Sequence, residues 1–124
     1  MGNLKKILIV EDEPSIRMII RQLLENEGYN VIGEGEDGED GFKKYLELNP
    51  DLVLMDIVMP KSDGLSCSKK IIAYNPKAKI IILTALNERK HVMSAIKSEV
   101  KGYIIKPIEK EQLLEKVAKV LAEA

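Results

Sequence analysis

The chain has 124 residues, 45% of them hydrophobic, and this length predicts one domain with a proper hydrophobic core. Lys and Arg number 19 and Asp and Glu 20, so the net charge of −1 favours neither nucleic acid nor an anionic membrane as a partner. No apolar stretch approaches the roughly 20 residues of a membrane span, and the single cysteine, Cys67, excludes an internal disulfide. We expect a cytoplasmic protein with one domain over 1–124 and a core over about 4–122.

Short apolar runs alternate with helical patterns in the first half of the chain. After the run 7–10, Pro14 suits the first turn of a helix and Gly28 suits its end, because proline lacks an N–H and glycine accepts a left-handed conformation. A second strand is predicted at 31–34. The helix that follows ends at Asn49, since the residue before a proline is disfavoured in a helix.

The same alternation continues in the second half. Apolar runs predict strands at 52–55, 80–83 and 103–105. Each run is followed by residues at helical spacing, which predicts three more helices. The third contains Leu65, Ser68, Ile71 and Ile72, the fourth has Val92, Ala95 and Ile96 facing inward, and the last has Leu113, Leu114, Val117, Val120 and Leu121 on one face. Five strands and five helices are therefore expected.

Strict alternation of strands and helices predicts a parallel sheet with helices on both faces, because parallel neighbours need a crossover connection. Right-handed crossovers reduce the topologies to a few. The pattern predicts the class, an α/β fold that forms a doubly wound (βα)5 sandwich, and does not by itself decide the strand order. We expect the flavodoxin-like order 2-1-3-4-5 among these topologies. In this order the first, third, fourth and fifth strands are consecutive neighbours.

Polar residues follow these four strands: Glu11 and Asp12, then Asp56, Thr84 and Lys106. The carboxyl ends of parallel strands meet at one edge of the sheet, where such folds bind ligands. Three carboxylates close together repel each other without a cation, and oxygen ligands favour a hard metal such as Mg²⁺. A carboxylate can attack phosphorus, and a metal, a lysine and a hydroxyl suit phosphoryl transfer. The set predicts a site for a divalent cation and a phosphoryl group.

Taken together, these motifs resemble the receiver domain of two-component response regulators, of the CheY-like single-domain type. The resemblance covers roughly residues 4–122. It rests on these motifs: Glu11-Asp12, Met55-Asp56-Ile57-Val58-Met59-Pro60, Asp63-Gly64, Thr84-Ala85 and Lys106-Pro107. Each motif alone is weak, but their order at four strand ends is specific.

The resemblance implies a role for each residue near the acceptor. Asp56 is the phospho-acceptor, and Lys106 pairs with its carboxylate and then with a phosphoryl oxygen. Asp12, Asp56 and the backbone carbonyl of Val58 are Mg²⁺ ligands, and Glu11 acts through water. The implied cofactor is therefore Mg²⁺.

The resemblance also implies how the signal is passed on. Thr84 hydrogen-bonds the phosphoryl group, Tyr103 is the switch aromatic, and the Lys106–Pro107 peptide bond is cis. The donor is a sensor histidine kinase or a histidine phosphotransfer protein. Phosphorylation repositions the surface of the fourth helix, fifth strand and fifth helix for a downstream target protein. Such a monomeric switch catalyses only its own phosphorylation and dephosphorylation and is otherwise not an enzyme.

Some residues depart from the pattern of the family. Val58 and Leu86 are apolar where polar side chains often help an attacking water, so we predict slow self-dephosphorylation. Glu99 stands where a glycine often ends the fourth helix, so that cap is expected to be rearranged. Gly41 replaces a common alanine and is predicted to weaken the second helix slightly.

The output of the switch stays open between several classes. Arg17-Met18 and Gly33-Glu34 favour a chemotaxis-type output, and a phosphorelay intermediate or a regulator of another enzyme is the alternative. A receiver that binds partners without phosphorylation normally lacks one of the acids or the lysine. A flavin or nucleotide carrier needs a phosphate-binding loop, where this chain has the acidic segment 11–14.

Overall fold

The computed structural model describes residues 5–57, 64–85 and 99–123. Five parallel strands form one sheet in the order β2-β1-β3-β4-β5. Their bounds are Lys6–Val10 (β1), Asn30–Gly35 (β2), Leu52–Asp56 (β3), Ile80–Thr84 (β4) and Gly102–Ile105 (β5). The predicted flavodoxin-like order is confirmed.

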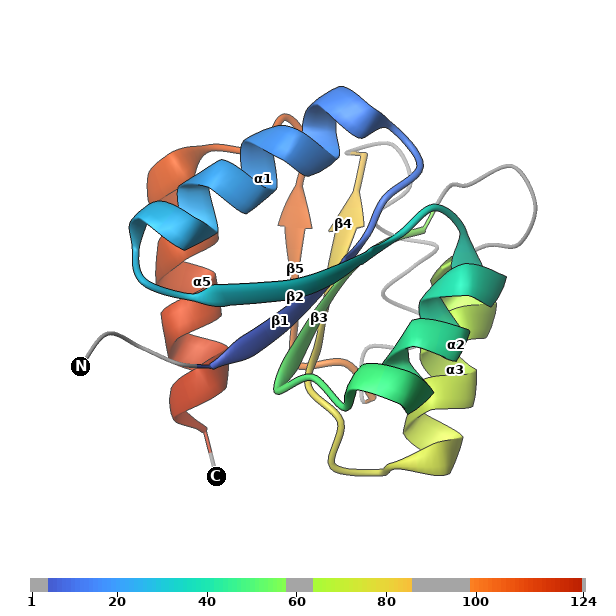
Figure 1. Cartoon of the computed structure of the whole chain (residues 1–124). Helices are drawn as coiled ribbons and strands as arrows, with labels where there is room; N and C mark the ends of the chain where they lie inside the picture. The colour runs from blue at the N-terminus through green and yellow to red at the C-terminus, as the bar shows by residue number, and fades with distance from the viewer. Residues whose placement is uncertain (1–4, 58–63, 86–98, 124) are drawn as a thin grey trace.

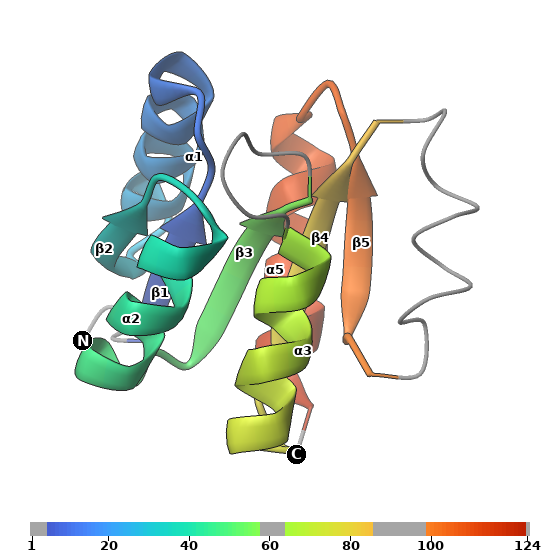
Figure 2. The same ribbon diagram turned by 90° about the vertical axis from the view of Figure 1, so that its right-hand side faces the viewer.

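Four described helices cover the two faces of this sheet. They are α1 (Pro14–Asn26), α2 (Gly38–Leu48), α3 (Gly64–Tyr74) and α5 (Lys110–Ala122). Figure 1 shows α1 and α5 on one side of the sheet and α2 and α3 on the other, and Figure 2 shows the same layers after a quarter turn. The helix predicted around Val92, Ala95 and Ile96 lies outside the described residues.

The central strands are buried on both faces, which explains their continuous apolar sequences. Every residue of β3 and β4 is buried. Alternate side chains point to opposite faces, so Leu8, Val53 and Ile82 pack towards α2 and α3. Their neighbours Ile9 and Leu54 pack towards α1 and α5. The sheet therefore separates two hydrophobic cores.

The ends of the first two helices follow the predicted signals. Helix α1 begins at Pro14, and Gly28 beyond its end has a φ of 90°. Helix α2 is closed by Asn49 in the left-handed conformation, directly before Pro50. The fourth helix lies outside the described residues, so the rearranged cap at Glu99 stays a prediction.

Gly41 has a packing role that the sequence analysis did not foresee. A Cβ atom at position 41 would lie 2.9 Å from both Cγ atoms of Val10 on β1. Valine has little freedom to move away, since its branched side chain is stiff. Gly41 thus allows α2 to pack closely on β1, and its predicted weakening of the helix stays a prediction.

Candidate functional site

The ends of four neighbouring strands bring the predicted residues together. Val10 pairs with Met55, Asp56 pairs with Leu83, and Thr84 pairs with Ile105. The residues that close β1, β3, β4 and β5 therefore lie at one level. We call this the carboxyl edge of the sheet and define it by Glu11, Asp12, Asp56, Thr84 and Lys106.

Three carboxylates form the acidic part of the carboxyl edge. One oxygen each of Glu11, Asp12 and Asp56 lie within 4.8 Å of one another. Glu11 and Asp56 are only 1% and 3% exposed, whereas Asp12 lies nearer the surface. Burial of like charges at this distance is unfavourable unless a cation compensates them.

Lys106 supplies one such cation from the end of β5. Its ammonium nitrogen lies 3.2 Å from Oδ1 of Asp56 and 3.1 Å from Oε1 of Glu11. Partial burial alone would lower the pKa of Lys106, but the two carboxylates outweigh it and raise the pKa above its usual value. Its backbone N–H donates to the carbonyl of Thr84 at 2.8 Å, which fixes the strand end. Lys106 is therefore held, charged, between the two buried acids.

Glu11 is only partly satisfied by its neighbours. Oε2 accepts a hydrogen bond from the N–H of Glu13 at 3.2 Å. Oε1 forms an ion pair with the Lys106 ammonium at 3.1 Å but has no hydrogen-bond partner of good geometry among the described residues. Burial, followed by the charge of Asp56, raises the pKa of Glu11 to about 7. A buried carboxylate in this condition fits a further cation or a water bound to one.

Thr84 and Tyr103 lie on the same face of the sheet. Thr84 is 1% exposed, and its hydroxyl donates to the carbonyl of Ala85 at 3.2 Å. Tyr103 pairs with Ile82 across β4 and β5 and packs, half-buried, against the core under α2 and α3. Because residues two apart on a strand share a face, Tyr103, which lies opposite Ile82, is on the same face of the sheet as Thr84.

The start of α3 packs against the backbone of Asp56. The N–H of Gly64 donates to the carbonyl of Ile57 at 3.1 Å. A Cβ atom at position 64 would overlap the carbonyl oxygen of Asp56 and lie 2.9 Å from Cα of Ile57. Glycine is thus required for α3 to approach the strand end that carries Asp56.

The remaining predicted site residues have different outcomes. The Lys106–Pro107 peptide bond is cis, as the resemblance implies. Val58 and Leu86 lie outside the described residues, so their roles stay predictions.

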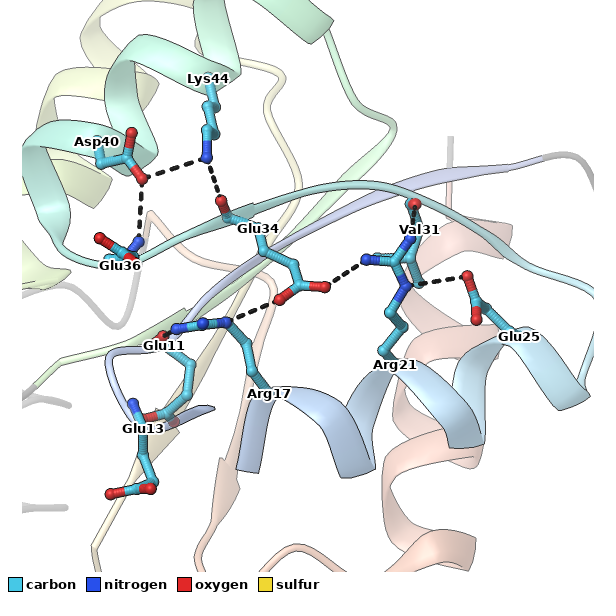
Figure 3. Close-up of polar contacts among 10 residues, drawn as sticks. All are labelled: Glu11, Glu13, Arg17, Arg21, Glu25, Val31, Glu34, Glu36, Asp40 and Lys44. Carbon is cyan, nitrogen blue, oxygen red and sulfur yellow. Dashed lines mark hydrogen bonds and ion pairs between the residues drawn. The ribbon is translucent and has the colours of Figure 1, made fainter. Parts of the chain in front are cut away.

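Sequence reasoning missed one set of contacts beside the site. Arg17 on α1 contacts both Glu34 on β2 and the carbonyl of Glu11 (Figure 3). Two arginines one turn apart, Arg17 and Arg21, were a signal for it. Glu34 near the end of the neighbouring strand β2 was their available partner. Arg17 and Glu34, which we took as cues for the output, thus have an intramolecular role.

The comparison with known families identifies the chain. A model of the response regulator receiver domain matches residues 7–118. The chemotaxis protein CheY of Thermotoga maritima is 39% identical over 116 residues, which is 94% of this chain and 97% of that protein. Protein CcdB of Bacillus subtilis is 40% identical over 116 residues, again 94% and 97% of the two chains. The chain belongs to the response regulator receiver family.

Solved structures agree with this assignment. The chain resembles one in the crystal structure of the CheX–CheY–BeF3–Mg²⁺ complex from Borrelia burgdorferi, with a TM-score of 0.89 and 31% identity. The match covers 96% of this chain and 90% of that chain. These likenesses place the chain in two-component signalling and are consistent with a chemotaxis-type role. No described helix is long and apolar enough to cross a membrane.

Proposed function

We propose that this receiver accepts a phosphoryl group on Asp56 in a Mg²⁺-dependent reaction and thereby switches its protein contacts. The observation that carries this proposal is the position of the Asp56 carboxylate. It is buried, it lies 3.2 Å from the Lys106 ammonium, and it shares one cluster with Glu11 and Asp12. A nucleophilic oxygen, a fixed cation and spare carboxylate ligands are the parts that phosphoryl transfer needs.

In the forward reaction an oxygen of Asp56 attacks phosphorus and forms the O–P bond of an acyl phosphate. With phosphohistidine as donor, the P–N bond breaks and its electron pair returns to the imidazole. Lys106 neutralises charge on the carboxylate and then on a phosphoryl oxygen, because its ammonium already lies beside Asp56. In the reset, water attacks phosphorus, the P–O bond to Asp56 breaks, and inorganic phosphate leaves while the carboxylate is regenerated. We propose that residues of this chain catalyse both steps.

Glu11, Asp12 and Asp56 fit Mg²⁺, because they offer only oxygen atoms and one of those atoms lacks a hydrogen-bond partner among the described residues. We propose Asp12, Asp56 and the backbone carbonyl of Val58 as direct ligands and Glu11 as a ligand through water. The ion would neutralise negative charge between acceptor and donor when bound.

We propose that Thr84 and Tyr103 transmit the change to the surface. The hydroxyl of Thr84 bonds to the neighbouring carbonyl of Ala85 and would exchange this partner for a phosphoryl oxygen. Tyr103, on the same face of the adjacent strand, would then turn inward. The surface that changes comprises β5, α5 and the predicted fourth helix, and a downstream target would bind there.

The donor is proposed to be a sensor histidine kinase or a histidine phosphotransfer protein. Met18 and Ile19 on α1 are 58% and 50% exposed, and Ile19 borders Lys106 and Pro107. Exposed apolar side chains so near the acceptor favour contact with a donor protein. We further propose that residues of about 4–122 form one receiver unit, which acts as a monomer in the cytoplasm. The similarity to CheY proteins over most of the chain supports this proposal.

Intact-protein mass spectrometry after incubation with acetyl phosphate tests the proposed function. We expect one phosphoryl adduct that depends on Mg²⁺ and is absent from Asp56→Asn. If Mg²⁺ binds but the wild type forms no adduct and beryllofluoride does not bind, the chain is a binding module that works without phosphorylation. Size-exclusion chromatography with light scattering, with and without beryllofluoride, tests the monomer.

A further inference from the structure

Arg17 connects helix α1 to the backbone of the site (Figure 3). Its Nη1 donates to the carbonyl oxygen of Glu11 at 2.7 Å, and its Nε donates to the carboxylate of Glu34 at 2.8 Å. The Arg17 side chain is only 14% exposed, so water competes weakly for these contacts. A guanidinium suits this bridge, because its planar fork presents several N–H donors in fixed directions.

The carbonyl that Arg17 contacts belongs to the peptide group between Glu11 and Asp12. On the other side of Glu11, the backbone N–H donates to the carbonyl of Gly35 at 3.0 Å. The backbone of Glu11 is thus held by β2 through its N–H and by α1 through its carbonyl. Because Asp12 follows directly, a fixed Glu11–Asp12 peptide restricts where the Asp12 backbone lies and so where its carboxylate can point.

Glu34 holds the guanidinium of Arg17 in place. Its second carboxylate oxygen pairs with Arg21, and its backbone carbonyl accepts from the ammonium of Lys44 on α2. Burial alone would raise the pKa of Glu34, but Arg21 and Arg17 outweigh it and lower the pKa. Glu34 therefore remains ionised at neutral pH and keeps both arginines.

We propose that Arg17 is a positioning residue for the magnesium site, which it serves by fixing the Glu11–Asp12 peptide. This inference rests on the proposed function, since it assigns the two acids to Mg²⁺. The ion requires nearly ideal octahedral geometry, so a small rotation of one carboxylate weakens binding. Groups that orient metal ligands change metal affinity by roughly 10- to 100-fold when they are removed.

Arg21 provides a matched control on the same helix. It lies one turn after Arg17 and shares Glu34 with it. Its other contacts are with Glu25 at 3.1 Å and with the carbonyl of Val31 at 3.4 Å, neither of which belongs to the Glu11–Asp12 segment. Loss of Arg21 therefore removes the same charge and the same Glu34 partner, from a more exposed side chain, without releasing the peptide that Arg17 holds.

Calorimetric titration of Mg²⁺ into the wild type, Arg17→Gln, Arg17→Lys and Arg21→Gln tests the proposal. We expect Arg17→Gln to weaken Mg²⁺ binding about tenfold, Arg21→Gln to change it little, and Arg17→Lys to recover part of the loss. Urea unfolding without Mg²⁺ should show that both glutamine variants stay folded, with the larger loss of stability for Arg17→Gln, because the Arg17 side chain is more buried. At saturating Mg²⁺, the rate of phosphorylation of Arg17→Gln by acetyl phosphate should return to that of the wild type.

Equal Mg²⁺ affinities for the two glutamine variants would overturn the positioning role, and so would a phosphorylation defect that saturating Mg²⁺ does not restore. If the wild type binds Mg²⁺ but forms no phosphoryl adduct, the proposed function is wrong, whatever the role of Arg17. The comparison of Mg²⁺ affinities would still decide the role of Arg17 in that case.

Discussion

Charged side chains are buried at one end of the parallel strands and partly exposed at the other end. At the carboxyl edge, Glu11 and Asp56 are almost completely buried and share one ammonium, that of Lys106. The opposite edge, which we call the amino edge, is defined by Lys6, Asp51 and Lys79. Here the charged side chains are at least partly exposed. Solvent therefore stabilises charge at the amino edge, but not at the carboxyl edge.

The charged side chains of the amino edge also form hydrogen bonds that give them a structural role. Asp51 accepts from the backbone N–H of Lys6 at 2.7 Å and thereby joins the starts of β1 and β3. Lys79 donates to the carbonyl of Leu121 at 3.3 Å, near the negative end of the α5 dipole. These contacts support the fold. The crowded carboxylates of the carboxyl edge do not, which is why we assign them to binding and chemistry.

The largest effect is expected from a methyl group at the carboxyl edge. Gly64→Ala should lower the free energy of unfolding by about 3 kcal/mol or more, because its Cβ would overlap the Asp56 carbonyl. Gly102→Ala at the start of β5 is the control, since its Cβ would meet only the flexible side chain of Lys116, at 3.0 Å. Urea denaturation measures both. Equal losses of stability would contradict the view that a Cβ meets rigid backbone at position 64 but only a movable side chain at position 102.

Removal of one buried charge should stabilise the carboxyl edge. The pKa of Glu11 is about 7 in the folded protein, against 4.5 as its ordinary value. The folded state therefore holds this proton more tightly, and stability falls as pH rises from about 4.5 to 7. Without Mg²⁺, Glu11→Gln should raise the free energy of unfolding at pH 8 by on the order of 2 kcal/mol. The gain should vanish near pH 4.

Asp51→Ala at the amino edge is the counterpart of that variant. It should lower the free energy of unfolding by about 1 kcal/mol at pH 8, because Lys6 loses a hydrogen bond. A loss of stability in Glu11→Gln of similar size would show that the two edges do not differ in the way proposed.

Protons and Mg²⁺ should compete at the carboxyl edge. Because the pKa of Glu11 is about 7 without metal, the acid is mostly ionised at pH 8 and mostly protonated at pH 6. The affinity for Mg²⁺ should therefore fall by about tenfold between these pH values, as expected for metal binding that displaces one proton. Titration calorimetry in two buffers of different ionisation enthalpy would also count the released proton. An affinity independent of pH would exclude Glu11 from the metal site.

The smallest expected effect concerns the lifetime of the acyl phosphate. Leu86→Glu and Val58→Asn introduce polar groups at the two positions where the family often has them. Each should lower the activation free energy of dephosphorylation by about 1 kcal/mol and so accelerate it severalfold. The decay of the adduct mass with time measures this. Unchanged lifetimes in both variants would refute the idea that apolar residues here slow the reset.

The fold and the main residues of the site could be predicted from the sequence for a simple physical reason. Continuous apolar strands between helices allow few topologies, and parallel strands bring their carboxyl ends together. Asp56, Glu11 and Lys106 are therefore neighbours through topology alone. The same rule explains why Thr84 and Tyr103 were found together on adjacent strands.

Contacts that depend on side-chain direction and on close packing were not predictable. Lys106 was expected beside Asp56, but its equal approach to Glu11 depends on the path of β5 beyond its last residue. The role of Gly41 depends on the distance between α2 and β1, which no pattern in the sequence states. The bridge from Arg17 to Glu34 required the register of β2 against β1.

Chemical trapping of the phosphorylated residue tests the central claim most directly. Borohydride reduces an acyl phosphate to an alcohol and so converts the modified aspartate to homoserine. Tryptic cleavage after Lys44 and Lys61 gives one peptide that contains Asp51 and Asp56, one from each edge of the sheet. Fragment masses from protein treated with acetyl phosphate and Mg²⁺ should place homoserine at position 56, with Asp51 unchanged. Homoserine at position 51, or at neither position in protein that carries the adduct, would contradict the account.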